Sequence, residues 1–217
     1  MTSFPSPNFG ERRQGVSPSL VVIHYTALSC EAARARLCDP AAEVSAHWLI
    51  SETGAVEALV DERHRAWHAG AGHWAGLEDI NSHSIGIELA NDGSQPFSEP
   101  QMAALEALLQ KIMVRWAIAP HRVIGHSDMA PTRKSDPGAR FDWRRLALQG
   151  LSVWPEGRGN PDAPLSGSLT RIGYPDAPDM ARLAAFRLRF RPWATGAETP
   201  DDRATADILA RAMATPL

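Results

Sequence analysis

Leu20-Val21-Val22-Ile23-His24-Tyr25 is the stretch of sequence that decides the fold, because it is a short apolar run that ends in polar side chains. Such a run, rich in β-branched residues, is typical of a buried strand. Side chains alternate between the two faces of a strand, so His24 shares a face with Leu20 and Val22. A lone histidine in such a strand is more often a satisfied core residue than a ligand, so His24 needs support from elsewhere in the chain.

Strand and helix patterns are interspersed on both sides of this run. Further strands are expected over 46–50, 56–60, 84–89 and 122–124, and helices over 31–37, 98–116 and 143–148. The turn Glu52-Thr53-Gly54 favours a hairpin between the first two of these strands. Ser98, with Pro100 and Gln101 after it, is a good helix start. The pattern predicts an α/β fold in which a mixed central β-sheet is flanked by helices.

Prolines and glycines indicate where the chain divides. They are dense between Trp154 and Pro178, and such density is incompatible with a long helix or a central strand. We therefore predict a first domain over 1–153, a linker over 154–163 and a small all-α module over 164–217. The module shows two helical patterns, one after a possible cap at Asp179 and one that begins at Thr199. A unit this short has little core of its own, so it either leans on the first domain or is a compact binding module.

Composition excludes several classes of protein. The chain has 217 residues, 44% of them hydrophobic, and a net charge of −3, which argues against nucleic acid as a partner. The longest solid aliphatic run, Leu20–Ile23, is too short to span a membrane. Cys30 and Cys38 are the only cysteines, which favours a reducing compartment. Because no secretory signal is visible at the start, we expect a cytoplasmic protein, or a periplasmic one if the natural N-terminus has been trimmed.

Two further segments carry side chains that suit catalysis. His126 follows a short strand and a glycine in Ile124-Gly125-His126, and Asp136 follows in Lys134-Ser135-Asp136. Two imidazoles and one carboxylate are a suitable ligand set for catalytic zinc, with a fourth position left for water. The separations along the chain, 102 residues from His24 to His126 and then 10 to Asp136, match no local metal motif.

Glu88 strengthens this hypothesis. In the strand Ser84–Leu89, alternation places Ser84, Gly86 and Glu88 on one face and the aliphatic residues on the other. A carboxylate on a face of small side chains suggests the floor of a cleft, although a solvated edge strand would give the same pattern. A serine triad around Ser127 is disfavoured, because no nucleophile-elbow glycine pattern surrounds that residue.

Six segments taken together carry a family resemblance. They are, in order, 22–27 (VIHYTA), 45–50 (SAHWLI), 66–70 (AWHAG), 84–89 (SIGIEL), 125–131 (GHSDMAP) and 133–138 (RKSDPG). From about Ser6 to Trp154 the chain resembles the zinc-dependent N-acetylmuramoyl-L-alanine amidases, which share a fold with peptidoglycan-recognition proteins. The segment Ala185–Pro192 resembles part of the helical peptidoglycan-binding-type module attached to some of these amidases.

The resemblance implies a metal site and a catalytic pair. Zinc would be held by His24, His126 and Asp136. Glu88 would accept the proton of the attacking water and pass it to the leaving amine. Lys134 would stabilise the oxyanion of the tetrahedral intermediate. How the work divides between Glu88 and Lys134 stays open at this point.

The same resemblance implies a substrate class. The enzyme would hydrolyse the amide bond between the lactyl group of N-acetylmuramic acid and L-alanine in peptidoglycan fragments, with anhydromuropeptides of cell-wall recycling as the expected substrate. His47, Trp67 and His68 are candidate substrate contacts. No obligate protein partner is implied. The alternative is a non-catalytic muropeptide recognition protein, but such relatives typically lack a zinc ligand, and all three candidate ligands are present here.

Overall fold

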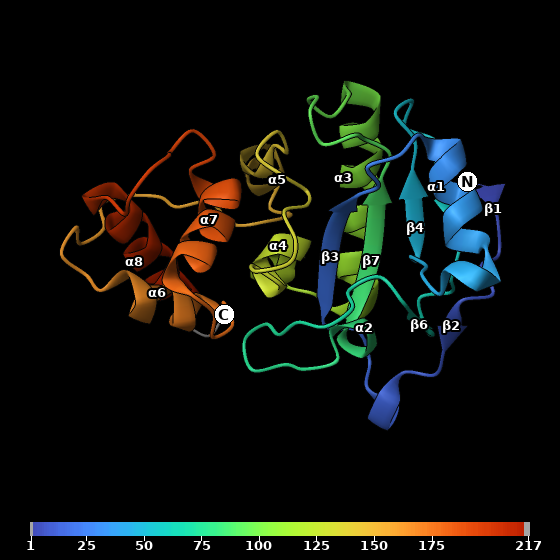
Figure 1. Ribbon diagram of the computed structural model, residues 1–217, viewed down its shortest axis with the longest axis horizontal. Helices are drawn as coiled ribbons and strands as arrows, with labels where there is room; N and C mark the ends of the chain where they lie inside the picture. Colours follow the sequence, from blue (N-terminus) through green and yellow to red (C-terminus); the bar gives the residue numbers. More distant parts are fainter. Residues whose placement is uncertain (1, 215–217) are drawn as a thin grey trace.

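The computed structural model describes residues 2–214, and its centre is a six-stranded sheet with the strand order β1-β5-β4-β7-β3-β8 (Figure 1). The strands of this sheet are β1 (Thr2–Ser3), β3 (Leu20–Tyr25), β4 (Trp48–Ile50), β5 (Val56–Ala58), β7 (Ser84–Leu89) and β8 (Val123–Gly125). A separate pair consists of β2 (Phe9–Gly10) and β6 (Arg65–Ala66). The helices are α1 (Cys30–Cys38), α2 (Ile80–His83), α3 (Glu99–Trp116), α4 (His126–Met129), α5 (Trp143–Leu148), α6 (Leu165–Ile172), α7 (Asp179–Phe190) and α8 (Pro200–Ala214). None of the helices within residues 2–214 has the length and apolar character needed to cross a lipid bilayer.

The direction of the strands places three candidate residues at one edge of the sheet. Strand β3 runs parallel to both β7 and β8, and within residues 2–214 the predicted hairpin of β4 with β5 is the antiparallel pairing of this sheet. The carboxyl ends of parallel strands meet at the same edge, where ligand sites of open α/β sheets are found. His24 pairs in register with Glu88, and His126 follows directly after β8.

Helices cover both faces of the sheet, so the predicted fold class is confirmed. On one face, Val21 and Ile23 pack into a core that α3 and α5 complete. On the other face, Leu20 and Val22 join a core to which α4, α6, α7 and α8 contribute. The start of α3 is as predicted, because the Ser98 side chain accepts a hydrogen bond from the backbone N–H of Gln101. Figure 1 shows α6, α7 and α8 beyond α4, on the side of β3 away from β4.

The C-terminal segment contains three helices where the sequence predicts two. Helix α6 is missed because Pro164, Gly167 and Gly173 favour a loop, yet it needs only eight residues between Pro164 and Gly173. Asp179 is also not a cap, since Pro178 occupies the N-cap position and Asp179 is the first residue of α7. The three helices bury apolar side chains in the same core as the sheet. The division into domains at 154–163 stays a prediction.

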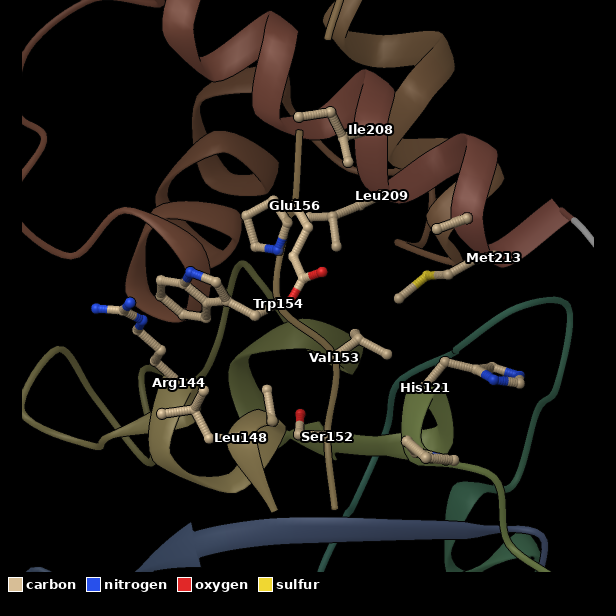
Figure 2. Close-up of a pocket in the computed structure, with 14 residues that line it drawn as sticks. His121, Arg144, Leu148, Ser152, Val153, Trp154, Glu156, Ile208, Leu209 and Met213 are labelled. Carbon is tan, nitrogen blue, oxygen red and sulfur yellow. The ribbon is translucent and has the colours of Figure 1, made fainter. Parts of the chain in front are cut away.

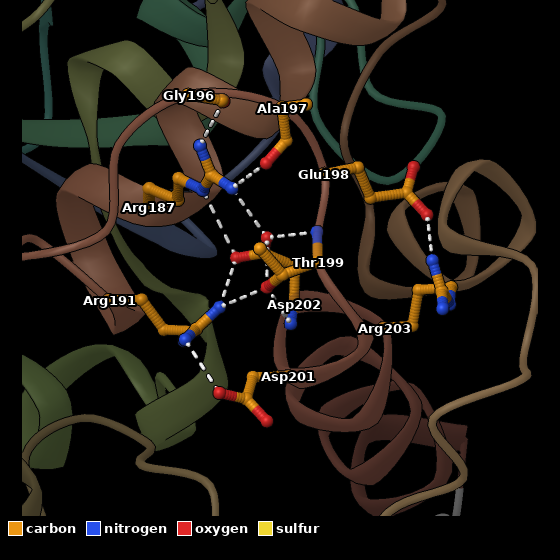
Figure 3. Close-up of polar contacts among 9 residues, drawn as sticks. All are labelled: Arg187, Arg191, Gly196, Ala197, Glu198, Thr199, Asp201, Asp202 and Arg203. Carbon is orange, nitrogen blue, oxygen red and sulfur yellow. Dashed lines mark hydrogen bonds and ion pairs between the residues drawn. The ribbon is translucent and has the colours of Figure 1, made fainter.

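A buried carboxylate holds α7, α8 and the loop between them together (Figure 3). Asp202 is 0% exposed and accepts hydrogen bonds from Arg187 and Arg191 at the end of α7. The backbone N–H and the hydroxyl of Thr199 donate to the same carboxylate, while the Thr199 hydroxyl accepts from the backbone N–H of Asp202. This reciprocal pair is a capping box, and it explains why α8 begins where the sequence predicts.

Asp202→Asn is expected to lower the free energy of unfolding by about 3–5 kcal/mol at pH 7, because it leaves the buried Arg187 guanidinium without its counter-charge. Burial alone would raise the pKa of Asp202, but hydrogen bonds from Arg187, Thr199 and Arg191 lower it below its ordinary value. An acid whose pKa is lowered by folding contributes stability that is present above the unfolded pKa, about 3.9, and is lost as the pH falls through the folded pKa. Urea unfolding at pH 7 and pH 3 measures both effects.

The difference in free energy of unfolding between wild type and Asp202→Asn should therefore be smaller at pH 3 than at pH 7, because pH 3 lies below the unfolded pKa and above the folded pKa of Asp202. Asp201→Asn is the matched control, because its carboxylate is exposed and contacts only Arg191 among the residues described, at 3.2 Å. An exposed pair of this kind contributes at most about 1 kcal/mol. An equal effect of the two substitutions would contradict the structural role of Asp202.

Candidate active site

A cavity of about 380 Å³ opens at the carboxyl edge of β3 and β7. Seven of the eight residues singled out from the sequence line it, and they are His24, Trp67, His68, Glu88, His126, Lys134 and Asp136. The parallel topology explains this convergence, because it brings the ends of β3, β7 and β8 to one edge although they are far apart in sequence.

Three ligand atoms meet at the base of the cavity. The Nδ1 atoms of His24 and His126 lie 2.9 Å apart, and each is close to Oδ2 of Asp136, at 3.0 and 3.1 Å respectively. All three residues are buried, with exposed fractions of 1%, 3% and 7%. Asp136 reaches the histidines because its carbonyl oxygen accepts a hydrogen bond from the backbone N–H of Ser127, which folds the loop back onto α4.

Hydrogen bonds on the far sides of the two rings decide which nitrogens carry protons. Nε2 of His126 lies 2.8 Å from the carbonyl oxygen of Ala69, which can only accept, so this nitrogen carries the proton. Nδ1 of a neutral His126 therefore presents a lone pair to Asp136. Metal-binding histidines generally donate their second N–H to such an acceptor.

The same conclusion holds for His24 through a longer chain of contacts. The Ser84 hydroxyl donates to the carbonyl of Ile80 and accepts from Nε2 of His68, at 3.1 Å. Nδ1 of His68 then accepts from Nε2 of His24, at 3.0 Å. Burial lowers the pKa of His24 to about 4, with His126 as the next cause, so its ring is neutral near pH 7. Nδ1 of His24 is left with a lone pair as well.

The donor set therefore fits a cation. Two imidazole Nδ1 atoms and a carboxylate oxygen face one another at about 3 Å, and in the tautomers that the outer hydrogen bonds select, both nitrogens can offer a lone pair to a positive ion. Ligand atoms of a tetrahedral zinc ion, at about 2.0–2.1 Å from the metal, lie about 3.3–3.4 Å apart. The three atoms thus need to move by only a few tenths of an ångström.

Gly86 makes room for this arrangement. A Cβ atom at this position would lie 2.4 Å from Cγ of His68, so the imidazole that orients His24 lies directly over the glycine. Of the predicted face Ser84, Gly86 and Glu88, only Glu88 lies at the floor of the cavity, and the ring of His68 covers the other two. Ser84 binds the ring of His68, Gly86 leaves space for it, and Glu88 lines the cavity.

Glu88 carries an unsatisfied acceptor toward the cavity. Among residues 2–214, Oε2 of Glu88 is buried and accepts no hydrogen bond, which is unusual for a carboxylate. Burial raises the pKa of Glu88 to about 8, Asp136 adds to the increase and Lys134 opposes it. A bound cation would bring the pKa down again, so Glu88 can exchange a proton near neutral pH, as general acid–base catalysis requires.

Lys134 and Trp67 lie nearer the opening. Lys134 is exposed at the rim and lines the cavity from the loop that also carries Asp136. Trp67 is half-buried, and its backbone N–H donates to the hydroxyl of Ser45. Both positions allow contact with a molecule that enters the cavity.

The sequence prediction that His47 contacts substrate is wrong. Its side chain is 0% exposed and does not line the cavity. Nδ1 accepts a hydrogen bond from the backbone N–H of Gly86, and Nε2 donates to the carbonyl of His64. Burial lowers the pKa of His47 to about 3. It supports β7 from behind His68 and is a structural residue.

Sequence reasoning misses two residues that support the site. The alternation pattern places Ser84 on the face of Glu88 and gives it no role, although its hydroxyl accepts a hydrogen bond from His68. Arg133 donates to the carbonyl of Ala69, the group that also binds His126. No local pattern marks Arg133, since its partner lies 64 residues earlier in the chain.

A second cavity, of about 760 Å³, lies between α5, the segment around Trp154 and α8 (Figure 2). Figure 2 shows Arg144 and Trp154 on one side of it, and His121 and Met213 on the other. Although this cavity is larger, the three metal-ligating side chains and Glu88 line the smaller one. The smaller cavity is therefore the candidate active site.

Comparison with known proteins agrees with this geometry. The family model described as N-acetylmuramoyl-L-alanine amidase matches residues 14–139, a range that contains all three candidate ligands and Glu88. The chain belongs to the N-acetylmuramoyl-L-alanine amidase family. It is therefore a hydrolase of the amide bond between N-acetylmuramic acid and L-alanine.

Individual amidases of known sequence or structure are similar over most of the chain. The amidase AmiD of Escherichia coli is 37% identical over 209 residues, which covers 80% of this chain and 75% of AmiD. The 1,6-anhydro-N-acetylmuramyl-L-alanine amidase AmpD of Haemophilus influenzae is 36% identical and covers 64% of this chain and 86% of AmpD. A solved complex of E. coli AmiD with anhydro-N-acetylmuramic acid-L-Ala-D-gamma-Glu-L-Lys has a TM-score of 0.83 at 34% identity, covering 94% of this chain and 98% of the other. AmpDh3 of Pseudomonas aeruginosa has a TM-score of 0.84 at 30% identity and covers 92% of this chain and 94% of the other.

Proposed function

We propose that this amidase is zinc-dependent and acts on anhydromuropeptides, the fragments that cell-wall recycling takes up. The observation that carries the proposal is the convergence of two imidazole lone pairs and one carboxylate, beside Glu88, in a single cavity. The two similar amidases AmiD and AmpDh3 have been solved with anhydromuramic peptides, which supports this substrate class.

We propose His24, His126 and Asp136 as the zinc ligands. When bound, the ion lowers the pKa of a water molecule and polarises the amide carbonyl. Glu88 accepts a proton from the attacking water and delivers it to the nitrogen of L-alanine as the carbon–nitrogen bond breaks. Lys134, at the rim, stabilises the negative charge that develops on the carbonyl oxygen.

Substrate contacts fall to the remaining residues of the rim. Trp67 offers an apolar surface that suits a sugar ring or a peptide stem, and His68 faces the cavity while it binds His24. We propose both as contacts, whereas the buried His47 does not reach the substrate.

The test is release of free stem peptide from an anhydro-N-acetylmuramic acid peptide, measured with zinc present and after chelation. Removing the metal is expected to lower the rate roughly 1,000-fold, since several kcal/mol of transition-state stabilisation are lost. Restoring zinc should restore the rate. Release that persists without metal would contradict the mechanism, and binding without any product during long incubation with zinc would favour a recognition protein instead.

A further inference from the structure

Asp128, two residues after the proposed ligand His126, is bound from both sides. Its side chain is 0% exposed. Oδ2 accepts a hydrogen bond from the backbone N–H of Gly125, at 2.9 Å, and so fixes the point where β8 turns into α4. Oδ1 accepts a hydrogen bond from the hydroxyl of Tyr174, at 2.7 Å. Tyr174 lies in the segment between α6 and α7. Both carboxylate oxygens are thus used to hold this turn.

Arg189 of α7 binds the same turn a second time. Its guanidinium donates to Oδ2 of Asp128 at 2.9 Å and to the carbonyl of Val123, in β8, at 2.8 Å. The Arg189 side chain is 1% exposed, and its guanidinium carbon lies 4.5 Å from the ring centre of Trp143. One side chain from the C-terminal helices therefore contacts both the strand before His126 and the helix that His126 begins.

Two of the three proposed zinc ligands depend on the geometry of this turn. His126 is its first helical residue, and the next residue, Ser127, donates a backbone hydrogen bond to the carbonyl of Asp136. A shift of the turn would move the imidazole and the carboxylate together. The third ligand, His24, is held separately by β3 and His68.

The stability of the fold does not by itself explain why Arg189 and Asp128 form a buried ion pair here. Desolvation offsets most of the attraction in such a pair, and apolar residues of similar size usually do as well. The contact between α7 and the sheet is otherwise apolar, with Phe186 and Phe190 in the shared core. The ion pair with Arg189 and the hydrogen bond from Tyr174 instead fix the position of the Asp128 carboxylate.

We propose that Tyr174 and Arg189 are positioning residues of the metal centre, which act through Asp128 to keep Nδ1 of His126 directed at Asp136 and His24. The proposal rests on the zinc site of the proposed function. It makes the C-terminal helices part of the active site's construction, in addition to any binding role they have.

The test measures affinity for zinc alone, by competition with a fluorescent chelator, in full-length wild type, Tyr174→Phe and Arg189→Met. Tyr174→Phe removes one hydroxyl and keeps the ring that packs against Trp74. Loss of supporting hydrogen bonds around metal ligands weakens affinity about 10–100-fold. We expect about tenfold for Tyr174→Phe and more for Arg189→Met. Should Arg189→Met fail to fold, Tyr174→Phe decides.

Arg187→Met is the matched control. Arg187 is another buried arginine of α7, but it binds Asp202 and loop carbonyls rather than the turn at His126. It should lower the melting temperature of the metal-free protein and leave the zinc dissociation constant unchanged. Zinc affinity that is unchanged in Tyr174→Phe and Arg189→Met, or weakened no more than in Arg187→Met, would overturn the proposal. Wild type that binds no zinc would overturn the proposed function, and this inference with it.

Discussion

Replacing Glu88 by glutamine is expected to lower kcat for stem-peptide release by about 100- to 10,000-fold, the range that a positioned acid–base group contributes. Glutamine keeps the shape of the side chain and cannot accept the proton of the attacking water. Glu88 lies outside the group of converging ligand atoms, so zinc affinity should stay within a few-fold of wild type. Steady-state kinetics with purified anhydromuropeptide, together with a zinc titration, measures both quantities.

Folding provides the control for this prediction. Oε2 of Glu88 is buried with no hydrogen bond among the described residues, and the raised pKa of about 8 keeps the carboxyl mostly protonated at pH 7 in the metal-free protein, so glutamine replaces one neutral group by another. The metal-free Glu88→Gln protein should therefore melt at or above the temperature of wild type. Full turnover in the zinc-loaded variant would remove Glu88 from its proposed role. The melting curve shows whether a variant that has lost turnover is still folded.

Asp136→Asn is expected to weaken zinc binding by more than about 100-fold, since even residues that only support a ligand account for 10–100-fold. Release of stem peptide should fall with it at zinc concentrations that saturate wild type. An amide oxygen is a weaker ligand than a carboxylate, and the amide nitrogen brings protons into a site that now holds lone pairs.

The metal-free protein should respond in the opposite direction. The N–H groups of asparagine can donate to the Nδ1 atoms of His24 and His126, which now face Oδ2 of Asp136 at 3.0 and 3.1 Å. Thermal unfolding in the presence of chelator should therefore show a melting temperature equal to or above that of wild type. Zinc affinity within tenfold of wild type would show that Asp136 is no ligand, and a collapse of metal-free stability would show that its carboxylate serves the fold.

The C-terminal helices α6, α7 and α8 belong to the same core as the sheet. From composition, the segment after residue 163 looks like a small module with little core of its own. In the structure its side chains complete the core on one face of the sheet, and Tyr174 and Arg189 reach the turn that carries His126. Proline and glycine density marks a break in secondary structure, but it carries no information about what packs across the break.

Local patterns are reliable here where an element is buried and polar or turn residues bound it. Strands β3 and β7 and helix α5 have the bounds that the sequence predicts, and the two strands are apolar because both faces of the sheet are covered. Helix α6 is missed because its flanking proline and glycines resemble loop residues. His47 is misassigned because a histidine beside a cleft and a histidine behind it look alike in a linear segment.

The sequence by itself determined the alternation of strands and helices, the chemistry of the candidate ligands and the family, since each depends on residue type and order along the chain. Only the tertiary structure decided that His24, His126 and Asp136 meet, because their separation in the chain is bridged by parallel strands ending at one edge. It alone also showed which ring nitrogens face the other two ligands and which distant side chains contact the turn at His126. Those properties depend on hydrogen bonds between residues remote in sequence, and such contacts leave no periodic signal.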